Sequence, residues 1–173
     1  ETLAGLAQTF SVLGAAAMAL PLARLTNRGG RRLALSVGLI TGLIGSVIAI
    51  TGGSTKNIYL MLLGSFLVGA ASASGYQARF AAIDLATEEN RAKQLSFVVW
   101  GSTIGAVTGP NLMEPSGRIA ESFGLPSLVG PYIVSAFTLG LAVLVIYLFL
   151  RPDPYLTAHK DAHAAGIIIK KTF

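Results

Sequence analysis

Long apolar blocks alternate with short polar segments along the chain. Five apolar blocks cover residues 2–23, 33–50, 58–83, 95–112 and 128–150. Each approaches the roughly 20 residues that a helix needs to cross a hydrocarbon core of about 30 Å. None alternates with the period of a membrane β-strand, and a lone segment in lipid must satisfy its own backbone hydrogen bonds. The pattern therefore predicts an all-α membrane protein with five transmembrane helices within residues 1–151.

Turn-forming residues separate the blocks. They are Asn27, Gly29 and Gly30 after the first block, Gly52, Gly53 and Ser54 after the second, residues 87–90 after the third and residues 115–126 after the fourth. Connections this short predict that consecutive helices are antiparallel neighbours. Pro152 and Pro154 end the last block, and we expect residues 152–173 to form a cytoplasmic linker or tail.

The basic residues predict the orientation in the membrane, because lysine and arginine beside spans are retained in the cytoplasm. In the alternating arrangement only Lys56 and Arg118 fall on one side. The other side carries Arg24, Arg28, Arg31, Arg32, Arg79, Arg91, Lys93, Arg151, Lys160, Lys170 and Lys171. We therefore expect a multi-pass protein of the plasma (inner) membrane, with the N-terminus of this chain outside and its C-terminus in the cytoplasm.

Composition supports lipid as the solvent and narrows the chemistry. Hydrophobic residues make up 53% of the chain and charged residues 12%, against about 25% charged in soluble domains. The net charge of +5 comes from residues between apolar runs, not from one basic stripe, which argues against nucleic acid. Many of the 20 glycines lie within spans, where helices associate through close backbone approach; Gly38, Gly42 and Gly45 share one side of the second block.

No constellation of catalytic residues is visible. Cysteine is absent, both histidines lie in the tail, and the carboxylates are confined to loops and block ends. Membrane enzymes place such groups at the membrane face of their helices. We expect a protein that is not an enzyme and has no cofactor and no metal site. A non-transporting scaffold or assembly protein is the alternative to a transporter.

The first resemblance to a known family lies in residues 23–32, which read Ala-Arg-Leu-Thr-Asn-Arg-Gly-Gly-Arg-Arg. This segment resembles the loop after the second helix in the major facilitator superfamily, whose pattern is Gly-x-Leu-Ala-Asp-Arg-x-Gly-Arg-Arg. The matching residues are Arg28, Gly30, Arg31 and Arg32, while Asn27 replaces the usual aspartate. The resemblance implies a cytoplasmic latch between two halves of a transporter. A plain basic loop is the alternative.

Acidic and basic residues beyond the third block extend this latch. Asp84 lies at the cytoplasmic end of the block and Arg91 follows in the same loop, in an order similar to that of many family members. We expect Asp84 to pair with Arg28, Arg31 or Arg32. A solvated loop of mixed charge is the alternative.

The second resemblance lies in the fourth block. Gly105, Gly109 and Pro110 match the antiporter pattern Gly-x-x-x-Gly-Pro-x-x-Gly-Gly of the same family, and Gly101 extends the stripe at spacing four. The closing glycine pair is missing. The resemblance implies a helix that bends against the other half of the protein, whereas glycines at this spacing also serve ordinary helix packing.

Together the resemblances cover the chain from the second to the sixth helix of a six-helix half-bundle. They imply that a first helix and a second, C-terminal six-helix half complete the protein as a transporter that works by alternating access. We expect proton-coupled antiport, with efflux of a small amphipathic substrate across the lipid bilayer. Because no ionisable residue lies in the middle of a block, we expect the proton carrier outside these helices. Polar residues that could line a cavity are Gln8, Gln77 and Asn111.

Overall fold

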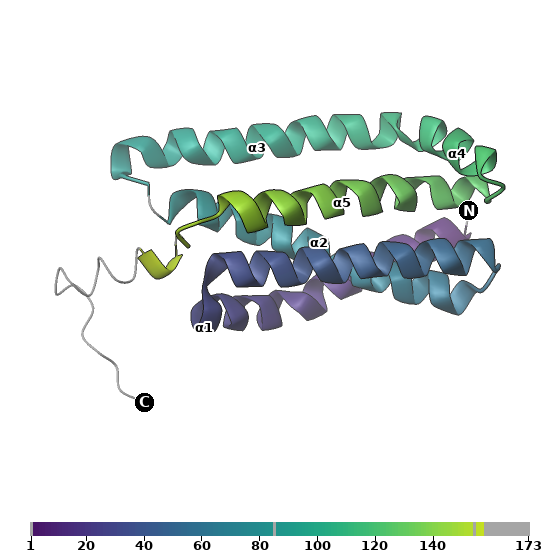
Figure 1. The fold of residues 1–173 in the computed structure, drawn as a ribbon, viewed down its shortest axis with the longest axis horizontal. Helices are drawn as coiled ribbons and strands as arrows, with labels where there is room; N and C mark the ends of the chain where they lie inside the picture. The colour runs from purple at the N-terminus through teal and green to yellow at the C-terminus, as the bar shows by residue number, and fades with distance from the viewer. Residues whose placement is uncertain (1, 85, 154, 158–173) are drawn as a thin grey trace.

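The computed structural model describes residues 2–84, 86–153 and 155–157. Within these residues the regular elements are all helical, as predicted, and the long helices run parallel or antiparallel to one another (Figure 1). In chain order they are α1 (Thr2–Ser54), α2 (Ile58–Ile83), α3 (Glu88–Asn111), α4 (Met113–Ser122), the 3-10 turn η1 (Ser127–Val129) and α5 (Gly130–Phe149).

Helix α1 is a helical hairpin. It folds back at Gly30, whose backbone has φ 85° and ψ 174°, a left-handed conformation that side chains with a Cβ rarely adopt. The two arms, residues 2–29 and 31–54, lie antiparallel (Figure 1). The turn expected from Asn27, Gly29 and Gly30 is thus concentrated in a single residue.

Small residues allow α1 and α2 to approach closely. A Cβ added to Gly69 of α2 would lie 2.6 Å from the backbone nitrogen of Ala15 in the first arm. In the second arm, a Cβ on Gly45 would lie 2.7 Å from the carbonyl oxygen of Gly64. Much of the buried interior consists of alanine and serine. The α1–α2 contact therefore depends on backbone proximity, the usual means of helix association in lipid.

The connection between α3 and α5 differs from the predicted turn over residues 115–126, because α4 occupies Met113–Ser122. Its small residues Ser116, Gly117 and Ala120 are buried on one face. On another face, Glu114 accepts a hydrogen bond from Arg118 one turn later. A buried face of small residues and an ion pair on the surface favour a short helix where the sequence pattern indicated only turn residues.

Three of the described helical segments are long and apolar enough to cross a membrane, namely Gly5–Ser54, Ile58–Ile83 and Ser127–Phe149, and the first is long enough for two crossings. Helix α3 has 24 residues, about 36 Å at the helical rise, and lies alongside the others (Figure 1). It is less apolar, because it begins with charged residues and contains serine, threonine and asparagine. Its crossing stays a prediction.

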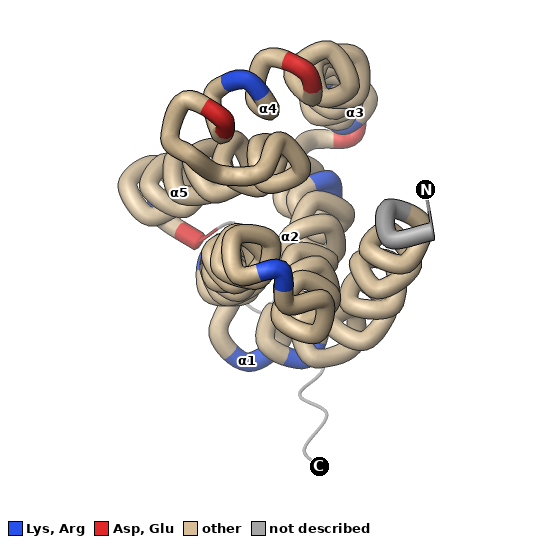
Figure 2. The backbone as a smooth tube through the Cα atoms, turned by 90° about the vertical axis from the view of Figure 1, so that its right-hand side faces the viewer, with Lys and Arg blue, Asp and Glu red and all other residues tan. Residues whose placement is uncertain are grey.

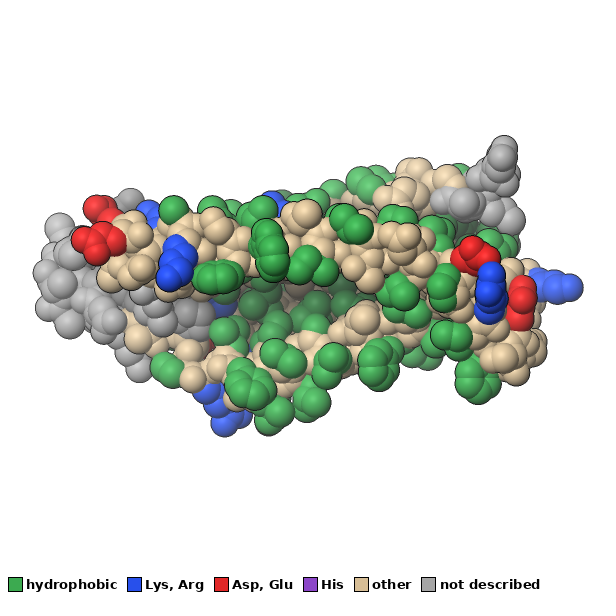
Figure 3. Space-filling model, turned by 90° about the horizontal axis from the view of Figure 1, so that it is seen from above, with side chains coloured by type: hydrophobic (Ala, Val, Ile, Leu, Met, Phe, Trp, Pro, Cys, Tyr) green, Lys and Arg blue, Asp and Glu red, His purple; other side chains and the backbone are tan. Residues whose placement is uncertain are grey.

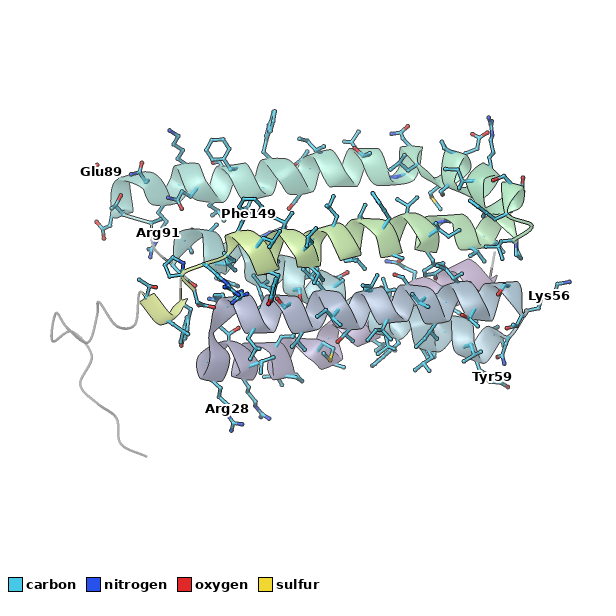
Figure 4. The ribbon with its side chains drawn as sticks, viewed as in Figure 1. Arg28, Lys56, Tyr59, Glu89, Arg91 and Phe149 are labelled. Atoms are coloured by element: carbon cyan, nitrogen blue, oxygen red, sulfur yellow. The ribbon has the colours of Figure 1, made fainter. Side chains whose placement is uncertain are left out.

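Charged residues gather toward the two ends of the bundle (Figure 3). Figure 2 looks along the bundle and shows acidic and basic residues in succession along α4. Arg28 and Arg91 lie at the end where α1 folds back, and Lys56 lies at the other (Figure 4). Figure 3 shows a face of hydrophobic side chains between these ends. We call the end that carries Arg28 and Arg91 the basic end, and the end that carries Lys56 the opposite end.

Candidate functional site at the basic end

The side chain of Arg31 is the centre of a polar cluster at the basic end. Its Nε donates to Oδ2 of Asp84 at 2.8 Å and its Nη1 donates to Oε1 of Gln77 at 2.6 Å. The guanidinium carbon also lies 5.5 Å from the centre of the Phe80 ring, within cation–π range. Only 12% of the Arg31 side chain and 17% of the Asp84 side chain are exposed.

The spacing in α2 explains why three of its residues reach one arginine. Gln77, Phe80 and Asp84 are three and four positions apart, so they project from one face of the last two turns. Arg31 begins the second arm of α1 directly after the Gly30 turn. The reversal at Gly30 thus places the arginine opposite this face of α2.

A second link joins the turn of α1 to the segment after α5. The carboxylate of Asp153 accepts hydrogen bonds from the backbone N–H groups of Arg31 (3.1 Å) and Arg32 (2.7 Å). These N–H groups belong to the first residues of the second arm of α1, so they have no acceptor within their own helix. Asp153 therefore acts as an N-cap supplied from a distant part of the chain. A Cβ on Gly30 would lie 2.6 Å from the carboxyl carbon of Asp153, so the contact requires glycine.

Asp153 also caps its own segment. Its Oδ1 accepts from the backbone N–H groups of Tyr155 (3.0 Å) and Leu156 (3.3 Å). The hydroxyl of Tyr155 donates to Oδ1 of Asn27 at 3.0 Å, and its ring lies 5.6 Å from the guanidinium carbon of Arg31. We call Asp153, Tyr155 and their partners in α1 the linker clasp.

The structure thus places the predicted latch residues in different surroundings. Arg31 and Asp84 are paired, and Asn27 belongs to the linker clasp. Arg32 lies over the ring of Tyr147, with its guanidinium carbon 4.7 Å from the ring centre. Arg28 and Arg91 are exposed, and Arg28 projects outward from the bundle (Figure 4); among the described residues, neither has an ion-pair partner.

The glycine stripe of α3 faces open space. Beyond the adjoining backbone of α3 itself, a Cβ on Gly101, Gly105 or Gly109 would meet no described atom within 4 Å. Pro110 lies in the last turn of the helix, and no residue of α3 is buried. Within the described part of the protein, therefore, no helix packs against this stripe.

The three residues predicted to line a cavity lie in three different parts of the structure. Gln8 lines a cavity of about 750 Å³ toward the opposite end, together with Ser65 and Tyr132. The hydroxyls of Ser65 and Tyr132 lie 2.8 Å apart in a hydrogen bond that links α2 to α5. Gln77 is held by Arg31 instead. Asn111 is exposed and donates to the carbonyl of Val107 in its own helix at 2.7 Å.

Comparison with known proteins identifies the family. The model of the Major Facilitator Superfamily matches residues 1–172. The chain belongs to the major facilitator superfamily. It is therefore a multi-pass membrane protein of a family of transporters.

Curated relatives from bacteria are similar over most of the chain. The uncharacterized MFS-type transporters YdeG and YddS of Bacillus subtilis (strain 168) are 39% and 35% identical to it, over 91% and 95% of its length. The riboflavin transporter RfnT of Brucella anthropi is 31% identical over 89% of the chain. The matches span 37% to 38% of the relatives' own lengths. No solved structure matches the chain significantly.

Within this superfamily chain, the sequence prediction missed Asp153, Tyr155 and Tyr147. A signal for the first was present: an aspartate followed by proline is a typical start of a helical turn, and Pro154 follows Asp153. Nothing in the sequence pattern indicated that this cap also serves a second helix more than 120 positions earlier. The remainder of the predicted tail, from residue 158 onward, lies outside the described residues.

Proposed function

We propose that this chain is part of an alternating-access transporter, in which it supplies five helices of one half-bundle. A first helix and a second half of six helices would complete the protein. Two observations support the proposal: the chain corresponds to less than two fifths of its relatives, and α3 presents a glycine face that no described helix covers. The parallel alignment of α3 and its small residues suit a helix that packs against the other half.

The observation that carries the mechanism is the partly buried Arg31–Asp84 pair. It joins the turn of α1 to the C-terminal end of α2, and Asp153 joins the same turn to the end of α5. Three helix ends are thereby held together around one turn, so that the basic end can move as a unit when one half rocks against the other. We assign the pair to the cytoplasmic side, where it fixes within this half the turn that would form the latch with the other half, and where Asn27 contributes a neutral hydrogen bond in place of an ionic one.

A double-mutant cycle tests this latch in the full-length protein. Asp84→Asn and Arg31→Ala should each reduce the initial rate of transport. Each leaves a charged or polar partner unsatisfied, at a cost of about 1–3 kcal/mol. Because both substitutions remove the same ion pair, the double variant should lose little more than Arg31→Ala alone, which also removes the contacts with Gln77 and Phe80.

The chain offers a matched control for the cycle. Arg118 and Glu114 also form an arginine–carboxylate pair, but both side chains are 76% exposed, and exposed pairs contribute little. Both residues also line the cavity beside Gln8, so this control is read by thermal unfolding and not by transport: Arg118→Ala and Glu114→Gln should leave the unfolding midpoint nearly unchanged, while Arg31→Ala and Asp84→Asn lower it. Strictly additive losses of transport rate at Arg31 and Asp84, or an equal drop of the midpoint in the exposed pair, would contradict the latch.

For the transported molecule we propose a small amphipathic compound that leaves the cell in exchange for protons. The cavity beside Gln8 supports this class, because apolar side chains such as Met61 and Val68 line it together with polar and charged side chains. Proteoliposomes that contain the full-length protein and an amphipathic dye should show dye flux that accelerates when a pH gradient is imposed. Flux that ignores the gradient would refute proton coupling, and uptake alone would refute efflux.

Transport of a flavin is the second candidate. It is favoured by the similarity to the riboflavin transporter of Brucella anthropi, which covers 89% of the chain. The same proteoliposomes, supplied with riboflavin in place of the dye, separate the two substrates. Saturable riboflavin flux without dye flux would select the flavin.

A further inference from the structure

Two arginines at the basic end share one aromatic ring. The guanidinium carbon of Arg32 lies 4.7 Å from the centre of the Tyr147 ring, and that of Arg151 lies 5.4 Å from it. Tyr147 is in the last turn of α5, and 57% of it is exposed. Two cations thus lie beside a ring on the surface of the bundle.

Neither guanidinium has an acidic partner among the described residues. Arg32 donates from Nη2 to the backbone carbonyl of Tyr147 at 3.0 Å, while its Nε is buried without a partner in that part of the chain. The Asp153 carboxylate accepts from backbone N–H groups. Neighbouring like charges repel and a buried donor without a partner is costly, so this arrangement is suited to an added anion.

The site lies where α5 reaches the end of its apolar surface. Leu144, Leu148 and Phe149 are 52%, 56% and 78% exposed, on a helix that is apolar enough to cross a membrane. Tyrosine is typical of the level at which a helix passes from hydrocarbon to headgroups. The headgroup of an anionic lipid bound at Tyr147 would therefore lie at its usual depth in the membrane, and the acyl chains of that lipid would lie against these exposed side chains.

We propose that Arg32, Arg151 and Tyr147 bind the phosphate of an anionic phospholipid. Guanidinium groups offer paired N–H donors that match phosphate oxygens, and the tyrosine hydroxyl supplies a further donor. Arg151 is exposed and can turn toward a headgroup beside the ring. A soluble phosphate would meet the same donors but would lack the apolar contacts along α5.

The test measures phospholipid bound to the full-length protein, by native mass spectrometry after reconstitution in nanodiscs of phosphatidylcholine with phosphatidylglycerol. Arg32→Gln and Arg151→Gln should each reduce bound phosphatidylglycerol about fivefold, the share of one arginine near an anionic surface. Arg79 is the matched control, because its guanidinium carbon lies 5.5 Å from the Tyr76 ring without a second arginine there. Arg79→Gln should change binding less than twofold.

Three results would overturn the proposal. The first is an equal loss of bound phosphatidylglycerol in Arg79→Gln. The second is that the unsubstituted protein retains phosphatidylcholine as well as phosphatidylglycerol. The third is displacement of the lipid by millimolar inorganic phosphate, which would indicate a site for a soluble anion. Should Arg32→Gln unfold, the exposed Arg151→Gln decides alone. Arg32→Lys should retain part of the binding, because it keeps the charge but loses the paired donors. Transport can fail or succeed independently of these results.

Discussion

Removal of the Asp153 carboxylate should loosen two helix starts at once. In the Asp153→Ala variant, the backbone N–H groups of Arg31 and Arg32 lose acceptors now at 3.1 and 2.7 Å. Those of Tyr155 and Leu156 lose acceptors at 3.0 and 3.3 Å. One side chain thus caps the second arm of α1 and the turn that follows α5.

The expected cost follows from the two caps. Loss of an N-cap costs about 1 kcal/mol, within a range of about 0.5–2, so two caps give about 2 kcal/mol. Part of the second cap is weak, because the bond from Leu156 is 3.3 Å long. The amides of Arg31 and Arg32 lose one of the two caps, and about 1 kcal/mol of local opening there corresponds to roughly fivefold faster exchange.

Hydrogen exchange of the full-length protein, read by mass spectrometry on peptides that contain Arg31 and Arg32, measures this effect. We expect faster exchange there and unchanged exchange in the middle of α2. Asp153→Asn keeps one acceptor oxygen and should have a smaller effect. Glu121→Ala removes an exposed carboxylate of α4 and serves as the control. Unchanged exchange at Arg31 and Arg32, or an equal response to Glu121→Ala, would refute the shared cap.

Three further substitutions test the packing. Gly30→Ala forces a positive φ onto alanine, which costs about 1–3 kcal/mol, and its Cβ would clash with the carboxylate of Asp153. The detergent-solubilised protein should unfold at lower temperature, and an unchanged midpoint would contradict the hairpin. Gly69→Ala should destabilise by about 1–3 kcal/mol through overpacking, whereas Gly75→Ala in the same helix meets nothing within 4 Å and should not; equal midpoints would argue against close approach of α1 and α2. Tyr132→Phe removes the hydroxyl bonded to Ser65 and should cost about 0.5–1.5 kcal/mol, measured by denaturant unfolding; no change would indicate that this bond is absent in the membrane.

Hydrophobic block length indicated where the long helices lie, but the turn residues located their ends only in part, because Gly52, Gly53 and Ser54 belong to α1 and the expected turn after the fourth block contains α4. The block at residues 58–83 has the bounds of α2, because polar residues flank its apolar run, Asn57 before it and Asp84 after it. The side-chain oxygen of Asn57 caps the helix by accepting hydrogen bonds from the backbone N–H groups of Tyr59 and Leu60. Helix α4 was missed because its signal is a buried face of three small residues. Such a face becomes visible only when a neighbouring helix covers it.

The candidate site was predictable where one segment carries the signal and not where distant segments meet. The pattern of residues 23–32 indicated the Arg31 region, and the position of Asp84 at the cytoplasmic end of its block indicated that residue as a partner. The choice of Arg31 over Arg28 depends on the backbone at Gly30, which turns one side chain inward and leaves the other outside. The cap from Asp153 depends on where α5 ends relative to α1, and this relation is a property of the packed bundle.

The most direct test of the central claim, that the helices cross a bilayer in alternating directions, is cysteine accessibility in intact cells. The chain contains no cysteine, so single cysteines at Arg28, Lys56 and Arg91 can be introduced without background from these residues. An impermeant maleimide added outside should label the Lys56→Cys variant, while Arg28→Cys and Arg91→Cys should react only after the membrane is opened. Labelling of positions 28 and 91 from opposite faces would contradict the account.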